Sequence, residues 1–199
     1  MWTFSAAVFL LIITPGPGVL STAGVGAAFG KEAGLRYVIG LFIGTNLVAL
    51  AVVTGLAAIV FSVPFVRSIL LVLSVLYLIY LAFRIASAGA KIAFIEAKSK
   101  PGILNGIALQ AINPKAYAVN TTLFTGFAFM PEAFLSETLI KFAIMALIWI
   151  PIHLAWLAAG IFVEQLNLDP KVQFRINIAM ASAMMIVVSL AVFSLIGGK

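Results

Sequence analysis

Long apolar stretches occupy most of the chain, and short polar segments separate them. A helix needs about 20 mostly apolar residues to cross roughly 30 Å of hydrocarbon, because it rises about 1.5 Å per residue. The pattern predicts six membrane-spanning helices, at about 4–28, 37–61, 65–85, 103–129, 138–163 and 174–196. We therefore expect an all-α polytopic membrane protein with a single transmembrane domain over residues 1–199.

Two of the six stretches contain a helix-breaking motif at the same depth. The first stretch carries Thr14-Pro15-Gly16-Pro17-Gly18, and the fourth carries Asn113-Pro114-Lys115. Proline removes a backbone donor and clashes with the preceding turn, so each motif is expected to break its helix. Pro15 lies 11 residues after Phe4, and Pro114 lies 11 residues after Ile103, at matching distances from the starts of their stretches.

The matched breaks divide the chain into two halves of three helices, at about 1–86 and 103–199, with a link at 87–102. Because three is odd, the second half enters the membrane upside down relative to the first. Many secondary transporters are built from such inverted repeats, and their broken helices mark a substrate site near the midplane. The sequence therefore predicts two inverted three-helix repeats with broken first and fourth helices. The alternative is that the prolines only kink helices for packing.

A polar residue stands before the proline of each break. Threonine or asparagine before proline is typical of a helix N-cap followed by a first turn. Each break is thus expected to begin a half-helix whose positive dipole end favours an anion, in particular a carboxylate. We predict a substrate site formed by Thr14, Pro15, Gly16, Pro17, Gly18, Asn113, Pro114 and Lys115.

Two ionisable side chains lie away from the ends of the predicted spans. Lys115 lies near the middle of the fourth span, where insertion of a lysine costs about 2.5 to 3.5 kcal/mol. We expect it to contact the substrate; otherwise it snorkels or pairs with carbonyls freed by Pro114. His153 follows Pro151 in the fifth span. It is predicted to be either a proton-linked or substrate-contacting group, or a hydrogen-bonded contact between helices.

Polar amides mark further positions of interest. Asn46 follows Gly40 and Gly44, whose spacing allows another helix to approach closely. Its amide suits a zwitterion and is included in the predicted site, although an interhelical hydrogen bond is the alternative. Asn120 lies seven residues after Asn113, on nearly the same helix face, and would extend a polar stripe. We do not include Asn120 in the predicted site.

The composition narrows the function. Of the residues, 64% are hydrophobic and 9% are charged, whereas a soluble domain carries about 25% charged residues. This charge density is too low for nucleic-acid binding. With no cysteine, one histidine and all six acids in loops or at span ends, we expect no catalytic residues, metal site or cofactor.

The lysines and arginines between the spans indicate the orientation. With the N-terminus outside, eight of the 12 basic residues fall on the inner side and three on the outer side, Lys141 among them, while Lys115 lies within a span. Basic residues favour the cytoplasm. We therefore predict that both termini lie outside and that the link at 87–102 is cytoplasmic.

Several motifs carry a family resemblance. They are the paired breaks, the second of which reads Asn113-Pro114-Lys115-Ala116, then Leu147-Ile148-Trp149 before Pro151, and Ile176-Asn177. Across essentially the whole chain, this pattern resembles the LysE/RhtB family of bacterial amino-acid exporters. The resemblance implies an inner-membrane permease driven by the proton-motive force. Basic-amino-acid exporters of the family can carry an acid in the second span, where this chain has Asn46, so a neutral cargo is expected.

We thus expect a secondary active exporter of neutral zwitterionic amino acids that works by alternating access. The substrate carboxylate is expected near the two breaks, and its ammonium near Asn46, Asn113, exposed carbonyls or His153. Protons are the expected coupling ion, taken up by either His153 or Lys115, and the glycines of the second span allow a homodimer. The alternatives are a small channel-forming or structural membrane protein, or an exporter of inorganic ions.

Overall fold

The computed structural model describes residues 1–14, 16–57 and 100–166, together with individual positions between 62 and 86 and between 169 and 186. All regular structure in these residues is helical, as predicted. The helices with defined bounds are α1 (Trp2–Ile13), α2 (Pro17–Val53), α5 (Ile103–Ile112), α6 (Pro114–Gly126) and α7 (Phe134–Gln165). The predicted third and sixth spans and the link between the halves lie largely outside the described residues.

The first predicted break separates α1 from α2. α1 ends at Ile13, and α2 begins at Pro17; Pro15 lies outside the described residues. Within α2, Gly30 has φ 76° and ψ −172°, which bends the helix between the predicted first and second spans. Glycine adopts positive φ without a steric penalty. The two spans are thus joined through a sharp bend.

The second predicted break separates α5 from α6. α5 ends at Ile112, Asn113 is extended with φ −78° and ψ 108°, and α6 starts at Pro114. A residue before proline avoids the helical region because the proline ring crowds it. The local chemistry of the Asn-Pro pair therefore explains why the helix is interrupted at this position.

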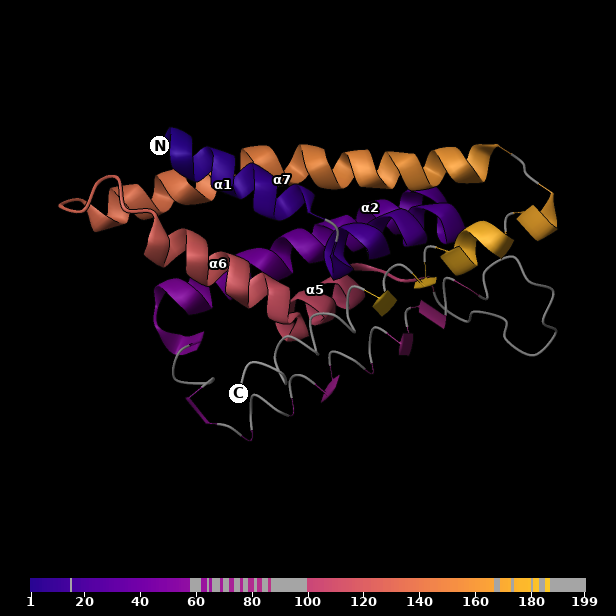
Figure 1. The fold of residues 1–199 in the computed structure, drawn as a ribbon, viewed down its shortest axis with the longest axis horizontal. Coiled ribbons are helices and arrows are strands. Elements are labelled where there is room, and N and C mark those ends of the chain that lie inside the picture. Colours follow the sequence, from indigo (N-terminus) through magenta and orange to yellow (C-terminus); the bar gives the residue numbers. More distant parts are fainter. Residues whose placement is uncertain are drawn as a thin grey trace.

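α7 is a long, apolar helix that contains Pro151. Two helices, at Pro17–Val53 and Phe134–Val163, are long and apolar enough to cross a membrane by length and composition. α1 and α5 are also apolar but shorter, because each ends at a break. In Figure 1, α1 lies beside the first half of α7, and α5 and α6 follow one another along α2.

Glycines bring α2 very close to its neighbours. A Cβ atom at Gly40 would clash with the backbone of Ile103, and one at Gly44 would lie 2.7 Å from the Cβ of Gln110. On the facing helix, a Cβ at Gly106 would clash with the carbonyl oxygen of Tyr37. The close approach predicted for Gly40 and Gly44 is therefore made within the chain, to α5. This glycine face is not free for a homodimer.

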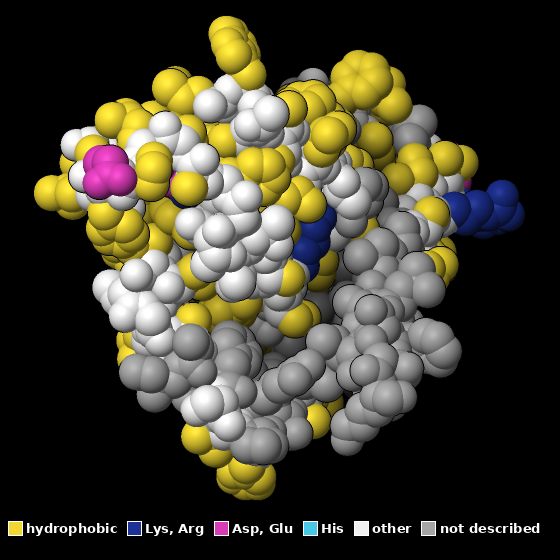
Figure 2. Space-filling view, turned by 60° about the vertical axis from the view of Figure 1, so that its left-hand side comes forward, with side chains coloured by type: hydrophobic (Ala, Val, Ile, Leu, Met, Phe, Trp, Pro, Cys, Tyr) yellow, Lys and Arg dark blue, Asp and Glu magenta, His cyan; other side chains and the backbone are white. Residues whose placement is uncertain are grey.

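The outer surface of the helices is apolar. Trp2 is 90% exposed, Leu104 80% and Leu147 74%. Figure 2 shows hydrophobic side chains over much of the described surface of the face in view. The core between the helices includes Tyr37, Leu41, Leu109 and Leu157. Large exposed apolar surfaces suit a lipid environment better than water.

Candidate functional site

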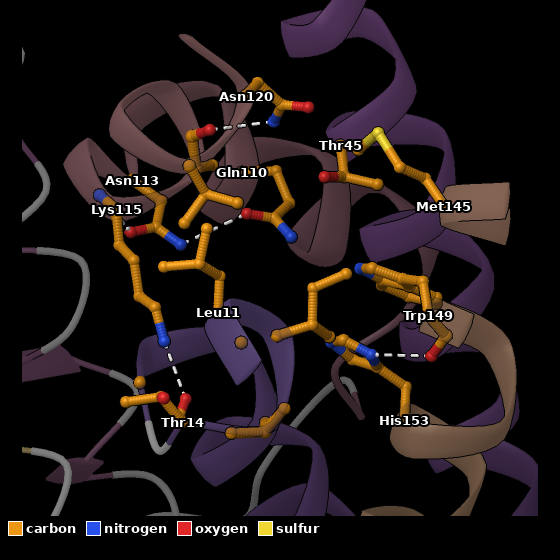
Figure 3. A pocket seen from close by; sticks show the side chains of 16 residues that line it. Leu11, Thr14, Thr45, Gln110, Asn113, Lys115, Asn120, Met145, Trp149 and His153 are labelled. Carbon is orange, nitrogen blue, oxygen red and sulfur yellow. Dashed lines mark hydrogen bonds between the residues drawn. The ribbon is translucent and has the colours of Figure 1, made fainter. Parts of the chain in front are cut away.

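A cavity lies where the two breaks meet (Figure 3). It encloses about 490 Å³ of empty space, part of it open to the outside. Every described helix contributes to its wall. The lining residues are Leu11, Ile12, Thr14, Gly16, Gly18, Val19, Thr45, Gln110, Asn113, Lys115, Ala116, Val119, Asn120, Met145, Trp149 and His153.

Lys115 connects the two breaks. Its Nζ donates a hydrogen bond of 2.6 Å to the carbonyl oxygen of Thr14, 101 residues away in the sequence. The side chain passes over Gly16, where a Cβ atom would lie 2.8 Å from Lys115 Cδ and 3.0 Å from Nζ. The lysine therefore pairs with a carbonyl of the opposite break and not with one freed by Pro114. One of its three ammonium hydrogens is used in this contact.

Asn113 caps the start of α6, as predicted. Its Oδ1 accepts a hydrogen bond of 3.1 Å from the backbone N–H of Lys115. A side-chain oxygen in this position satisfies one of the donors that the first turn of a helix leaves unpaired. The same side chain also donates, from Nδ2 to Gln110 Oε1 at 3.1 Å.

Thr14 does not cap α2, and that prediction was wrong. Its hydroxyl donates back to the carbonyl of Leu10 at 2.6 Å, and Thr14 is the C-cap of α1. The N-cap of α2 is Gly16, with Pro17 in the first turn. With two prolines in the motif, the helix starts at the second, so the residue before Pro17 takes the cap position. Threonine readily bonds to the carbonyl four residues earlier.

A short chain of hydrogen bonds determines which end of the Gln110 amide is the oxygen and which is the nitrogen. A backbone N–H can only donate, so the atom of Asn113 that faces Lys115 N must be the oxygen. Asn113 Nδ2 then donates to Gln110, whose acceptor must be Oε1. This leaves Gln110 Nε2, a donor, on the cavity side in Figure 3.

A hydrogen bond likewise determines which ring nitrogen of His153 carries the hydrogen. Its Nδ1 lies 3.0 Å from the carbonyl oxygen of Trp149. Since a carbonyl only accepts, Nδ1 carries the hydrogen, and Nε2 is the acceptor in a neutral ring. The ring stacks on Trp149, with centroids 3.5 Å apart. A Cβ at Gly18 would lie 3.6 Å from His153 Nε2, so this nitrogen faces the start of α2.

The structure brings together six of the ten predicted site residues: Thr14, Gly16, Gly18, Asn113, Lys115 and His153 line the cavity. Pro17 and Pro114 begin α2 and α6 without lining it. Asn46 also lies off the wall, and its amide donates to the carbonyl of Phe42 at 2.7 Å; its neighbour Thr45 lines the cavity instead. Pro15 lies outside the described residues.

Sequence reasoning did not include Gln110, Thr45 or Asn120 among the site residues, although all three line the cavity. Gln110 is 4% exposed and lies in an otherwise apolar stretch of α5. It precedes Asn113 by three residues, a spacing that places two side chains on nearly the same side of the chain in a helical segment. A glutamine within an apolar stretch, three residues before the asparagine of the break, was the sequence signal that could have identified it.

A second polar cluster joins the end of α6 to the start of α7. Lys141 Nζ lies 2.8 Å from Glu137 Oε1, and both side chains are buried. Glu137 Oε2 accepts from the backbone N–H groups of Phe129 and Met130. Lys141 Nζ also donates to the carbonyl of Phe124 at 3.2 Å. Lys141 is only 2% exposed, so this lysine, counted among the outer charges, is enclosed by the protein, and its side of the membrane stays a prediction.

Comparison with known proteins gives a consistent result along the whole chain. The model of the LysE type translocator family matches residues 9–196. A leucine efflux protein of Enterobacter sp. (strain 638) is 26% identical over 131 residues, which cover 63% of this chain and 62% of that protein. The alignment thus spans less than two thirds of the relative's length. No solved structure matches the chain.

Proposed function

The chain belongs to the LysE type translocator family, and from this premise we propose that it exports neutral, zwitterionic amino acids across the bacterial inner membrane. The similarity to a leucine efflux protein supports an amino-acid cargo. The observation that carries the proposal is the contact of Lys115 with Thr14 on the wall of the cavity. It supports a cationic anchor at the junction of two broken helices, where a substrate carboxylate binds.

The carboxylate is held by hydrogen-bond donors on the cavity wall. Lys115 Nζ and Gln110 Nε2 are two of them. The start of α2 adds backbone N–H groups, because no side-chain hydrogen bond caps it within the described residues. Such groups, at the positive end of the helix dipole, favour an anion. The ammonium of the substrate lies toward hydrogen-bond acceptors elsewhere on the wall.

The rest of the wall suits an uncharged side chain. Leu11, Ile12, Val19, Val119 and Met145 line the cavity, and none of its described lining residues is acidic. A lysine or arginine substrate would bring a second positive charge next to Lys115 without a carboxylate to balance it. A neutral, aliphatic amino acid is therefore the favoured cargo.

Transport proceeds by alternating access, with the two halves moving about the cavity. The arriving carboxylate competes with the Thr14 carbonyl for the Lys115 ammonium, which loosens the contact between the breaks. His153 takes up the coupling proton from outside, so that the proton-motive force drives export. Both termini lie on the outer side of the membrane and the link at 87–102 is cytoplasmic, since this arrangement places most of the basic residues on the inner side.

The test is counterflow in proteoliposomes that contain the purified protein and are preloaded with unlabelled amino acid. Labelled leucine, lysine and glutamate are supplied outside, with and without a pH gradient. We expect saturable uptake of leucine, weak uptake of the charged amino acids, and a rate that responds to the gradient. Leucine uptake no faster than in empty liposomes would remove this substrate class, and unselective conductance in planar bilayers would favour a channel.

A further inference from the structure

Asn120 carries a buried acceptor that nothing in the described structure satisfies. The side chain is 1% exposed and lines the cavity. Its Nδ2 donates to the carbonyl of Ala116 at 2.7 Å, but Oδ1 has no hydrogen-bond partner among the described residues. Most buried polar atoms in proteins are hydrogen-bonded. An unpaired one on the wall of a cavity therefore points to a ligand.

The unpaired atom of Asn120 must be an oxygen. The two ends of an asparagine amide are often assigned from their hydrogen bonds, and here the bond to Ala116 settles the assignment. The Ala116 carbonyl accepts only, so the group facing it must be the donor, Nδ2. The end left over is an acceptor, and its ligand must supply a hydrogen.

The cavity wall carries hydrogen-bond donors in one part and an acceptor in another. Lys115 Nζ and Gln110 Nε2 present donors, whereas Asn120 Oδ1 presents an acceptor. Thr45, which also lines the cavity, adds a hydroxyl that can accept as well. A ligand with a carboxylate and an ammonium satisfies both parts, and a simple carboxylate satisfies only the first.

We propose that Asn120 Oδ1 accepts a hydrogen bond from the substrate ammonium and so makes the protein select amino acids over carboxylates that lack an amino group. This assignment rests on the proposed function and names the residue by which the transporter would select its substrates. A site that hydrogen-bonds a substrate group strongly rejects the analogue that lacks it, because the buried partner is then left unpaired.

The experiment measures competition against labelled leucine in counterflow, with three unlabelled competitors: leucine, 4-methylpentanoate, which lacks the amino group, and 3-methylbutylamine, which lacks the carboxylate. The readout is the ratio of the inhibition constants for 4-methylpentanoate and leucine. In the unmodified protein we expect this ratio to be about 10 or more, since a hydrogen bond to a charged group is lost in the analogue. In Asn120→Leu we expect the ratio to fall by about tenfold.

Asn46→Leu is the matched control. Asn46 makes the same hydrogen bond, from Nδ2 to the carbonyl four residues earlier at 2.7 Å, but does not line the cavity. Its substitution should leave the ratio unchanged. An equal fall in both variants would show that the loss of a helix-internal hydrogen bond is responsible and would overturn the assignment.

Asn120→Asp keeps the inference testable if the leucine variant does not fold. A carboxylate at this position attracts an ammonium more strongly than an amide does. We expect 3-methylbutylamine to compete about tenfold better against this variant than against the unmodified protein; no gain contradicts the assignment. If the unmodified protein transports leucine but the ratio of inhibition constants is unchanged in Asn120→Leu, only the role of Asn120 is contradicted.

If the unmodified protein does not transport leucine, the proposed function is contradicted as well.

Discussion

Lys115 Nζ and the carbonyl oxygen of Thr14 lie 2.6 Å apart, so the one charged side chain at the second break bonds to the backbone of the first. The carbonyl is available because α1 ends at Ile13 and no helix continues through Thr14. An ammonium within the membrane needs such a partner, since leaving it unpaired in an apolar environment is costly. The contact links two interrupted helices at the wall of the cavity.

The space over Gly16 is required by the Lys115 side chain. We expect Gly16→Ala to displace the ammonium, because the new Cβ would lie 2.8 Å from Cδ and 3.0 Å from Nζ. Gly18→Ala is the matched control, since its Cβ would lie at ordinary contact distances, 3.6 Å from His153 Nε2 and 3.8 Å from Gln110 Nε2. In counterflow, Gly16→Ala should raise the KM for leucine more than Gly18→Ala. The opposite order would contradict the position of Lys115 described here.

Gln110 tests the donor side of the cavity. Gln110→Glu keeps an oxygen that accepts from Asn113 but replaces the Nε2 donor by a carboxylate oxygen. We expect the KM for leucine to rise by about tenfold or more, since an attractive contact to the substrate carboxylate becomes a repulsive one. The Tm of the protein in detergent should change little, because the substitution affects substrate binding and not folding. An unchanged KM would place the substrate carboxylate elsewhere.

The cap at Asn113 is expected to contribute to stability independently of the substrate. Asn113→Ala removes the oxygen that accepts from Lys115 N, and the loss of such a cap destabilises a protein by about 0.5 to 2 kcal/mol. Asn113→Asp retains the capping oxygen and should restore most of the Tm, although it no longer donates to Gln110. Equal losses of Tm in the two variants would mean that the cap is not the stabilising element.

Glu137 and Lys141 form an ion pair within α7, and we expect this pair, through its hydrogen bonds to Phe124, Phe129 and Met130, to contribute to stability. Removing one partner of a buried pair leaves an uncompensated charge and destabilises by about 3 to 5 kcal/mol. We therefore expect Glu137→Gln to lower the Tm substantially and Glu137→Gln with Lys141→Met to lower it less. Thermal unfolding in detergent measures both. A double variant less stable than the single one would show that the two charges do not act as a pair.

His153 is the residue at which proton coupling is tested. Gln in its place keeps a polar side chain that does not titrate. If His153 carries the coupling proton, His153→Gln should exchange leucine in counterflow but should no longer respond to a pH gradient. The measurement compares initial rates with and without the gradient. A response as large as in the unmodified protein would transfer the coupling role to another group.

The main features of the fold follow from local chemistry that the sequence displays. Proline fixes its own φ and restricts the residue before it, so the breaks near Pro17 and Pro114 were predictable without knowledge of the tertiary structure. Thr14 was misjudged because two prolines compete for the first turn of α2, and local preference alone does not decide between them. The arrangement as two inverted repeats of six spans stays a prediction.

The cavity wall was harder to predict because it depends on contacts between distant segments. Asn120 was recognised as part of a polar stripe, but its unpaired oxygen becomes apparent only when its surroundings are known. Lys141 was counted as a charge between spans, whereas rings from Phe4, Phe124 and Phe129 surround its ammonium at 5.6 to 5.8 Å. Its spacing of four residues from Glu137 was the one sequence signal of this pairing.

The most direct test of the central claim is leucine counterflow in proteoliposomes with Lys115→Ala, compared with the unmodified protein and with Lys31→Ala. Lys31 is an exposed lysine next to the bend at Gly30 and serves as the control for the loss of a positive charge. The account predicts that Lys115→Ala abolishes saturable leucine uptake in a folded, extractable protein, while Lys31→Ala retains it. Unchanged uptake in Lys115→Ala would contradict the binding of the substrate carboxylate at this lysine.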